Sequence, residues 1–250
     1  MCSRRALAAL PRAVIRSRRA LSIKPDRFSS FGGLDSGLSV ATLLQEQEEK
    51  PAHLWESVVR EAERILVSEH KHARHLQSLL ETRVLPHQGL PEAVSAALAK
   101  KLVGHGMSEA SWRALIDDVI LDYPGFAYAA ACDLARYVEI DPAADGHLSV
   151  FLFFKGFQAV QCARIAHHLW REEDAQCRLL ARMLQCRSSH TWGVDIHPGA
   201  VLGHGVTLDH ATGIVIGETA VVGNNVGFMH DVTLGATGKS PDHDLSLIHI

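Results

Sequence analysis

The sequence predicts an α+β protein in which an N-terminal all-α helical domain precedes the first coils of a left-handed parallel β-helix. Two observations lead to this class. Between residues 51 and 190 apolar side chains recur at helical spacing, whereas residues 193–238 repeat every six residues. A period of six matches neither an amphipathic helix nor an alternating strand, and it is typical of the hexapeptide repeat of a parallel β-helix.

The six-residue repeat can be counted from Ile196, because every sixth position after it is apolar. These positions are Ile196, Leu202, Leu208, Ile214, Ala220, Val226 and Val232. Each short strand is expected to place one aliphatic side chain inside, and a turn follows at once. The seven hexads amount to little more than two coils of roughly 18 residues, whereas a stack of about three or more repeats is needed to bury a continuous core. We therefore expect the β-helix to be incomplete within this sequence.

The segments outside these two regions differ in composition. Residues 1–35 are rich in arginine interleaved with apolar residues, and the first acidic residue is Asp26. This pattern predicts an organelle transit peptide for the mitochondrion or plastid, and a disordered basic tail on a cytosolic protein is the alternative. Residues 36–50 are expected to be a linker. Residues 239–250 are expected to be an aberrant tail that does not continue the repeat.

Composition excludes several classes of function. The chain has 250 residues and a net charge of −3, which argues against nucleic acid as the main partner. It contains no apolar run of about 18 residues, so we expect no membrane-spanning helix. The five cysteines form no CxxC pair and have irregular spacing, which indicates reduced thiols rather than a disulfide or zinc framework. We expect no metal.

The candidate chemistry lies in the β-helix, where histidine and acidic residues are poor fillers of tight coils. Asp195 and His210 are separated by a little less than one coil of the repeat, so we expect them to meet between stacked coils. A carboxylate that accepts from one imidazole nitrogen fixes the tautomer and leaves the other nitrogen as a base. Such a base activates a hydroxyl nucleophile. From spacing alone, exposed turn residues remain the alternative for this pair, and a helix cap or turn residue remains the alternative for Asp141.

Several blocks of sequence make the chemistry more specific, because residues 141–239 resemble the serine O-acetyltransferases. The blocks that carry the resemblance are DPA at 141–143, KGFQA at 155–159, VDIHP at 194–198, LDHATG at 208–213, IGETA at 216–220 and VTLG at 232–235. The pairing of LDHATG with IGETA is specific. A single hexad is not, since many acyltransferases share the β-helix.

The resemblance implies transfer of an acetyl group from acetyl-CoA to the hydroxyl of L-serine, which gives O-acetylserine for cysteine biosynthesis. It implies no permanently bound cofactor, with acetyl-CoA as co-substrate. His210 is similar to the general base, and Asp195 to its orienting partner. Asp141 and Asp209 match the carboxylates that hold the substrate amino acid. The CoA-binding residues are not assigned, because the later coils that supply the groove are missing from the pattern.

The resemblance also implies a homo-oligomer, either a trimer or a dimer of trimers, and O-acetylserine sulfhydrylase as a partner of a full-length form. The pattern departs from the family after residue 235: Ala236 replaces a glycine, and no arginine follows Arg187 to pair with a substrate carboxylate. We therefore expect impaired activity from this chain.

Three alternatives remain open. The first is another hexapeptide acyltransferase with a different acceptor. The second is a zinc β-helix protein of the γ-carbonic-anhydrase type, which needs converging histidines such as His204, His210 and His230. The third is a catalytically dead scaffold.

Overall fold

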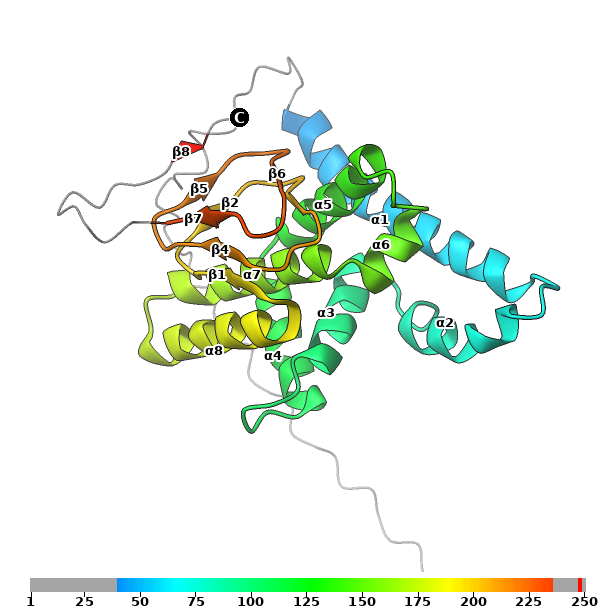
Figure 1. The fold of residues 1–250 in the computed structure, drawn as a ribbon, viewed down its shortest axis with the longest axis horizontal. Coiled ribbons are helices and arrows are strands. Elements are labelled where there is room, and N and C mark those ends of the chain that lie inside the picture. The colour runs from blue at the N-terminus through cyan, green and yellow to red at the C-terminus, as the bar shows by residue number, and fades with distance from the viewer. Residues whose placement is uncertain (1–39, 236–246, 249–250) are drawn as a thin grey trace, which may run out of the picture. The chain divides into compact units, whose positions relative to one another are not determined.

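The structure, a computed structural model, describes residues 40–235 and 247–248 (Figure 1). The transit peptide expected in residues 1–35 lies outside the described residues, as do residues 239–246 and 249–250 of the expected tail. Within the described part of the chain, no helix combines the length and the apolar character needed to cross a membrane.

The helices come first along the chain and the strands follow, so the predicted α+β class is confirmed. The helices are α1 (Val40–Leu66), η2 (Ala73–His75), α2 (Gln77–Arg83), α3 (Leu90–Lys101), α4 (Glu109–Asp122), α5 (Phe126–Ile140), α6 (His147–Phe153), α7 (Lys155–Arg171) and α8 (Ala175–Trp192). The strands are β1 (Val194–Ile196), β2 (Val201–Leu202), β3 (Thr207–Leu208), β4 (Ile214–Ile216), β5 (Val221–Val222), β6 (Gly227–Phe228), β7 (Thr233–Leu234) and β8 (Leu247–Ile248).

The helical region has different limits from those that the sequence predicts. Helix α1 begins at Val40, so residues 40–50, expected to be linker, are helical. Pro51, where the predicted helical domain begins, lies inside α1 and is buried. Helix α8 ends at Trp192, because Gly193 takes a left-handed φ of 70° that suits glycine after a helix.

The β-helix is built from three parallel sheets with the strand orders β1-β4-β7, β2-β5-β8 and β3-β6. Its coils differ in length. Asp195 pairs with Val215 in the following coil, and Val215 pairs with Thr233 in the coil after that. These pairings make the first coil longer than the second by two inserted residues. Strand β8 lies inside the expected aberrant tail, and it pairs in parallel with β5.

The insertion lies in the turn at residues 209–213 and shifts the six-residue repeat. The buried strand residues that stack on one another are Ile196 on Ile216 and Leu234, Leu202 on Val222, and Leu208 on Phe228. The predicted register is therefore wrong after Leu208 by two residues. The shift cannot be read from the sequence, because the positions two residues before the stacked residues Ile216, Val222 and Phe228 are apolar as well. These positions, Ile214, Ala220 and Val226, are also buried.

A buried ion pair joins the helical domain to the first coil. Asp133 of α5 and Arg164 of α7 have side chains only 0% and 3% exposed. The guanidinium donates to both carboxylate oxygens, at 2.9 and 3.0 Å. The Val206 backbone N–H also donates to Asp133 at 2.8 Å, and Arg164 donates to the carbonyls of Leu202 and Gly203. Two helices and the β2–β3 segment thus share one hydrogen-bond network.

A second junction fixes strand β3. The buried Tyr137 hydroxyl accepts a hydrogen bond from the Leu208 N–H at 2.7 Å and donates to the Leu208 carbonyl at 3.1 Å. Gly156, in the first turn of α7, lies against the same group. A Cβ at Gly156 would collide with the Leu208 carbonyl oxygen and lie 2.5 Å from the Tyr137 hydroxyl oxygen. Only glycine allows α5, α7 and β3 to meet this closely.

The first prediction concerns this close approach. We expect Gly156→Ala to lower the free energy of unfolding by about 1–3 kcal/mol, because Leu208 or Tyr137 must move to make room. Urea denaturation measures the change. The matched control is Gly223→Ala, since a Cβ there has no neighbour within 4 Å; we expect a change within about 0.5 kcal/mol. Equal midpoints for both variants and the unsubstituted protein would contradict the packing argument.

The second prediction concerns the buried ion pair. We expect Asp133→Ala to destabilise the protein by about 3–5 kcal/mol, because it leaves the Arg164 charge buried without its partner. The control is Glu139→Ala. It removes the Arg136–Glu139 pair, in which the Glu139 side chain is 68% exposed, and should cost no more than about 1 kcal/mol. Similar losses in the two variants, measured by thermal unfolding, would show that the buried network does not stabilise the junction.

Candidate active site

The inserted turn at residues 209–213 presents His210 at the protein surface. Its backbone is strained, because His210 and Ala211 have φ values of 54° and 58°, in the left-handed region that disfavours side chains. Such conformations cost roughly 1–3 kcal/mol each and persist only where surrounding structure enforces them. The side chain of Ala211 is buried, whereas that of His210 is 73% exposed.

Several hydrogen bonds enforce this turn. The Asp209 N–H donates to the Phe228 carbonyl at 2.7 Å in the next coil, and the Gly213 N–H donates to the Gly193 carbonyl at 2.8 Å. The ammonium group of Lys155, at the start of α7, donates to the Thr212 hydroxyl. The turn is thus held by both neighbouring coil segments and by the helical domain, while the imidazole between these points faces solvent.

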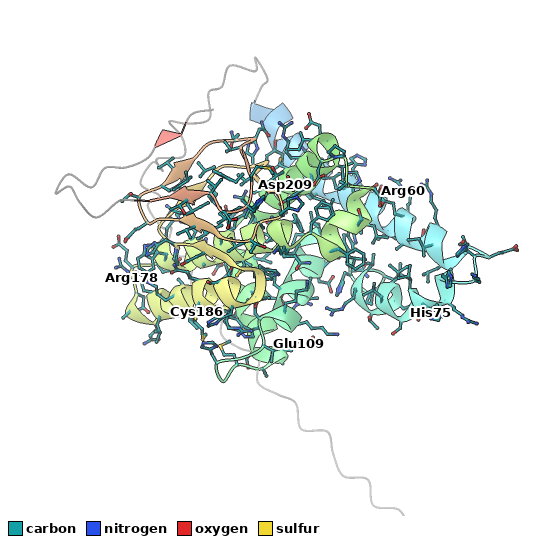
Figure 2. All side chains as sticks on the ribbon, in the orientation of Figure 1. Arg60, His75, Glu109, Arg178, Cys186 and Asp209 are labelled. Carbon is teal, nitrogen blue, oxygen red and sulfur yellow. The ribbon has the colours of Figure 1, made fainter. Side chains whose placement is uncertain are left out.

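Two of the predicted substrate carboxylates lie near one buried hydroxyl. Asp141 ends α5 one turn after Tyr137, and Asp209 directly follows Leu208, whose peptide groups Tyr137 binds. Burial raises the pKa of Tyr137 far above its usual range, and the charges of Asp133, Asp141 and Asp209 raise this pKa further. The hydroxyl therefore stays protonated, and the charges of Asp141 and Asp209 both favour its neutral form. Figure 2 shows Asp209 where the β-helix meets α5.

Asp141 also behaves as the turn residue that the local sequence suggested. Its Oδ1 accepts a hydrogen bond from the Ala143 N–H at 2.9 Å. Among the described residues, the second carboxylate oxygen of Asp141 has no hydrogen-bond partner. The turn therefore orients the carboxylate without using all of its hydrogen-bonding capacity.

The imidazole of His210 has an acidic and an aromatic neighbour. Its Nε2 lies 3.8 Å from Asp209 Oδ1, and its ring centroid lies 5.7 Å from that of His230 in an edge-to-face arrangement. At 3.8 Å the carboxylate makes no direct hydrogen bond to the ring. It still places a negative charge close to a group that becomes positive when it takes a proton.

Asp195 does not contact His210 within the single chain. Its Oδ1 accepts a hydrogen bond from Gln185 Nε2 of α8 at 2.7 Å. Among the described residues no ion pair joins its carboxylate to His210. The strand register places Asp195 opposite Val215, five residues beyond His210, and His210 lies in the turn between β3 and β4 rather than in the paired strand. The predicted meeting of the two residues between coils is not formed within one chain.

The remaining histidines of the β-helix have separate surroundings. His197 Nδ1 accepts from the Gly199 N–H at 2.9 Å, and its ring packs edge-on against Trp170. Burial lowers the pKa of His197, as does the nearby Arg182. Its Nε2 lies 3.7 Å from Glu218 Oε2. We interpret His197 as part of the turn structure.

The three histidines that a zinc β-helix site would need are not gathered in one chain. The ring of His204 packs against Tyr128 at 5.4 Å, and burial lowers the pKa of His204. His210 and His230 are in contact with each other. Within the described residues, His204 does not join them in a group with metal-ligand separations.

Two residues that position the site had no role in the sequence prediction. Tyr137 clamps strand β3, and Lys155 holds Thr212. Each residue has a weak signal in the sequence. Tyr137 precedes Asp141 by one helical turn, and Lys155 begins the KGFQA block at 155–159. Neither signal identifies a partner, because both partners are distant in the sequence.

Comparison with known proteins points to one family. A family described as "Serine acetyltransferase, N-terminal" matches residues 54–162. The chain is 42% identical over 195 residues to a probable serine acetyltransferase 5 of Oryza sativa subsp. japonica, covering 78% of this chain and 55% of the relative. It is 39% identical over 186 residues to a serine acetyltransferase of Haemophilus influenzae, covering 74% of this chain and 67% of the relative.

Solved structures give the same result. A soybean serine acetyltransferase complexed with serine aligns with a TM-score of 0.71 and 38% identity, over 78% of this chain and 77% of that one. A serine acetyltransferase in complex with CoA aligns with a TM-score of 0.69 and 39% identity, over 74% and 76%. The chain spans between half and about two thirds of the length of the rice and Haemophilus relatives. On sequence and on structure, the chain belongs to the serine acetyltransferase family.

Proposed function

We propose that this protein transfers the acetyl group of acetyl-CoA to the hydroxyl of L-serine, giving O-acetylserine for cysteine biosynthesis. The observation that carries the proposal is His210, held exposed on an enforced turn beside Asp209, in a chain of the serine acetyltransferase family. The structures of relatives complexed with serine and with CoA support the two substrates.

The proposed mechanism is direct transfer with His210 as general base. The imidazole takes the proton of the serine hydroxyl, because an aliphatic hydroxyl is a weak nucleophile near neutral pH. The oxygen then attacks the thioester carbonyl, so that a C–O bond forms, the C–S bond breaks and CoA leaves as the thiolate. The Asp209 carboxylate 3.8 Å from Nε2 stabilises the imidazolium that results.

Asp141 and Asp209 are the proposed ligands of the substrate ammonium group. Burial raises the pKa of the Tyr137 hydroxyl and keeps it neutral, and the charges of both carboxylates add to this rise. A tyrosine hydroxyl carries no positive charge in any protonation state, so Tyr137 does not neutralise these carboxylates. An ammonium group placed between them supplies that positive charge. Within the single chain Asp195 does not contact His210, and its carboxylate accepts a hydrogen bond from Gln185 instead.

We propose a homo-oligomer, a trimer or a dimer of trimers, with the sites between neighbouring subunits. Support comes from exposed apolar side chains on the β-helix: Val215 is 39% exposed, and Met229, next to His230 in the sequence, is 52% exposed. Exposed apolar groups on the coils that carry an exposed base fit a surface that a second subunit covers. The CoA-binding residues stay unassigned.

Two further proposals rest on sequence resemblance and composition. Residues 1–35 direct the protein to the mitochondrion or plastid, and the protein is cytosolic if they do not serve as a transit peptide. O-Acetylserine sulfhydrylase is the proposed partner of a full-length form.

The third prediction tests the base in protein expressed from its complete coding sequence. We expect His210→Ala to lower kcat by about 100-fold or more, which is the usual contribution of a general base. Release of the CoA thiol from acetyl-CoA in the presence of L-serine measures the rate. The control is His230→Ala, which removes the ring that packs on His210 and should retain most activity. A kcat for His210→Ala close to that of the unsubstituted enzyme would refute the assignment.

The fourth prediction separates substrate binding from proton transfer. We expect Asp141→Asn to raise the KM for L-serine at least about tenfold, because the ammonium loses a charged partner, while the KM for acetyl-CoA stays unchanged. Asparagine retains an oxygen for the Ala143 N–H, so the turn is preserved. Asp145→Asn in the same loop is the control, and an equal rise of the KM for L-serine in both variants would contradict the proposed role of Asp141.

Asp195→Asn completes the series. We expect it to reduce kcat less than His210→Ala does, since Gln185 and not the imidazole holds the carboxylate. A loss as large as that of His210→Ala would show that Asp195 reaches the base in the assembled enzyme.

A further inference from the structure

A cluster of metal-ligand residues lies on the helical domain, separate from the candidate active site. Cys186 and His190 are four residues apart on α8 and therefore lie on the same face of the helix. His105 comes from the loop between α3 and α4, 81 residues before Cys186 in the sequence. Figure 2 shows Cys186 on α8. The three side chains offer one sulfur and two imidazole nitrogens.

The separations of these atoms resemble those of a metal site. Cys186 Sγ lies 3.8 Å from His105 Nε2 and 3.7 Å from His190 Nδ1, and all three ligand atoms lie within 4.8 Å of one another. Tetrahedral zinc with Zn–S near about 2.3 Å and Zn–N near about 2.05 Å places sulfur and nitrogen about 3.6 Å apart. The two sulfur–nitrogen distances are thus already within a few tenths of an ångström of that geometry.

The loop that carries His105 is held in place by α8. Arg187, next to Cys186, donates from Nε to the Leu102 carbonyl at 3.1 Å and from Nη2 to the Val103 carbonyl at 2.9 Å. Its guanidinium passes so near Gly104 that a Cβ there would lie 3.1 Å from it. The loop carrying the first ligand is therefore fixed to the helix carrying the other two.

The loop is also closed on itself. Gly104 and Met107 exchange two backbone hydrogen bonds, at 3.1 and 3.3 Å. Between them His105 has a φ of 53°, a left-handed conformation that is unusual for a residue with a side chain. The surrounding bonds hold this conformation, and it directs the His105 ring onto that of His190, with centroids 5.9 Å apart and planes at 28°. Strain of this kind gathers where a ligand-binding geometry is pre-organised.

We propose that His105, Cys186 and His190 form a binding site for a thiophilic divalent transition metal, with Zn²⁺ as the best fit. One thiolate and two imidazoles suit zinc and its analogues, whereas magnesium and calcium need oxygen ligands. As the sulfur–metal bond forms, the Cys186 thiol releases its proton to solvent, and the imidazoles bind in their neutral form. His105 and His190 are exposed, so a water molecule takes the fourth position.

The metal links the α3–α4 loop to α8, the helix whose Gln185 holds Asp195. It stabilises the folded protein by binding it in preference to the unfolded chain. This site does not depend on the proposed acetyl transfer, since its residues are distinct from His210, Asp141 and Asp209.

The test is a Co²⁺ titration of the untagged 250-residue chain, reduced with a phosphine, because cobalt bound to a thiolate gives a ligand-to-metal charge-transfer band. We expect the band to saturate at one equivalent and Zn²⁺ to displace it. Cys186→Ser should abolish the band, and His105→Gln and His190→Gln should each weaken Co²⁺ binding at least about tenfold. Circular dichroism checks that each variant is folded.

Two controls separate this site from other thiols and histidines. Cys177→Ser, on the same helix, and a variant with His70, His72 and His75 all changed to Gln should both retain the band and its affinity. A folded unsubstituted protein without the band, or a band that persists in Cys186→Ser, overturns the proposal. If Cys186→Ser does not fold, the loop variant His105→Gln decides: unchanged affinity in it overturns the proposal as well.

Discussion

The buried pair of Asp133 and Arg164 is the interaction on which the rest of the structure depends. Two opposite charges withdrawn from water are tolerated when hydrogen bonds satisfy the charged groups themselves. Here Arg164 donates to the Leu202 and Gly203 carbonyls, and Asp133 accepts from the Val206 N–H. The backbone of the first coil therefore completes the network, which sets the position of the β-helix on the helical domain.

Three residues on one face of α5 connect the buried ion pair to the candidate site. Asp133, Tyr137 and Asp141 are spaced by four residues and so lie along one side of the helix. The first fixes the coil, the second binds both peptide groups of Leu208, and the third ends the helix with a carboxylate near the surface. The strained turn with His210 follows Leu208 directly. Buried contacts of α5 with the first coil therefore help to fix the position of His210.

The sequence predicted the fold class and the candidate residues better than their contacts. The repeat identified a β-helix, but its register after Leu208 was wrong by two residues, because apolar residues such as Ile214 and Ile216 occupy both possible positions. The spacing of Asp195 and His210 predicts a meeting between coils, but Asp195 lies in a strand opposite Val215 and His210 lies in a turn. Cysteine spacing gave no sign of the approach of His105 to Cys186.

Local sequence pattern accounts for the helices followed by short parallel strands and for the motifs that place the chain among the serine acetyltransferases. Tertiary structure decided what depends on distant segments. It showed that Gln185 holds Asp195, that Tyr137 binds the peptide groups of Leu208, and that α8 meets the α3–α4 loop. The physical reason is that side-chain periodicity is local, whereas contacts between elements follow from packing, which no spacing along the chain encodes.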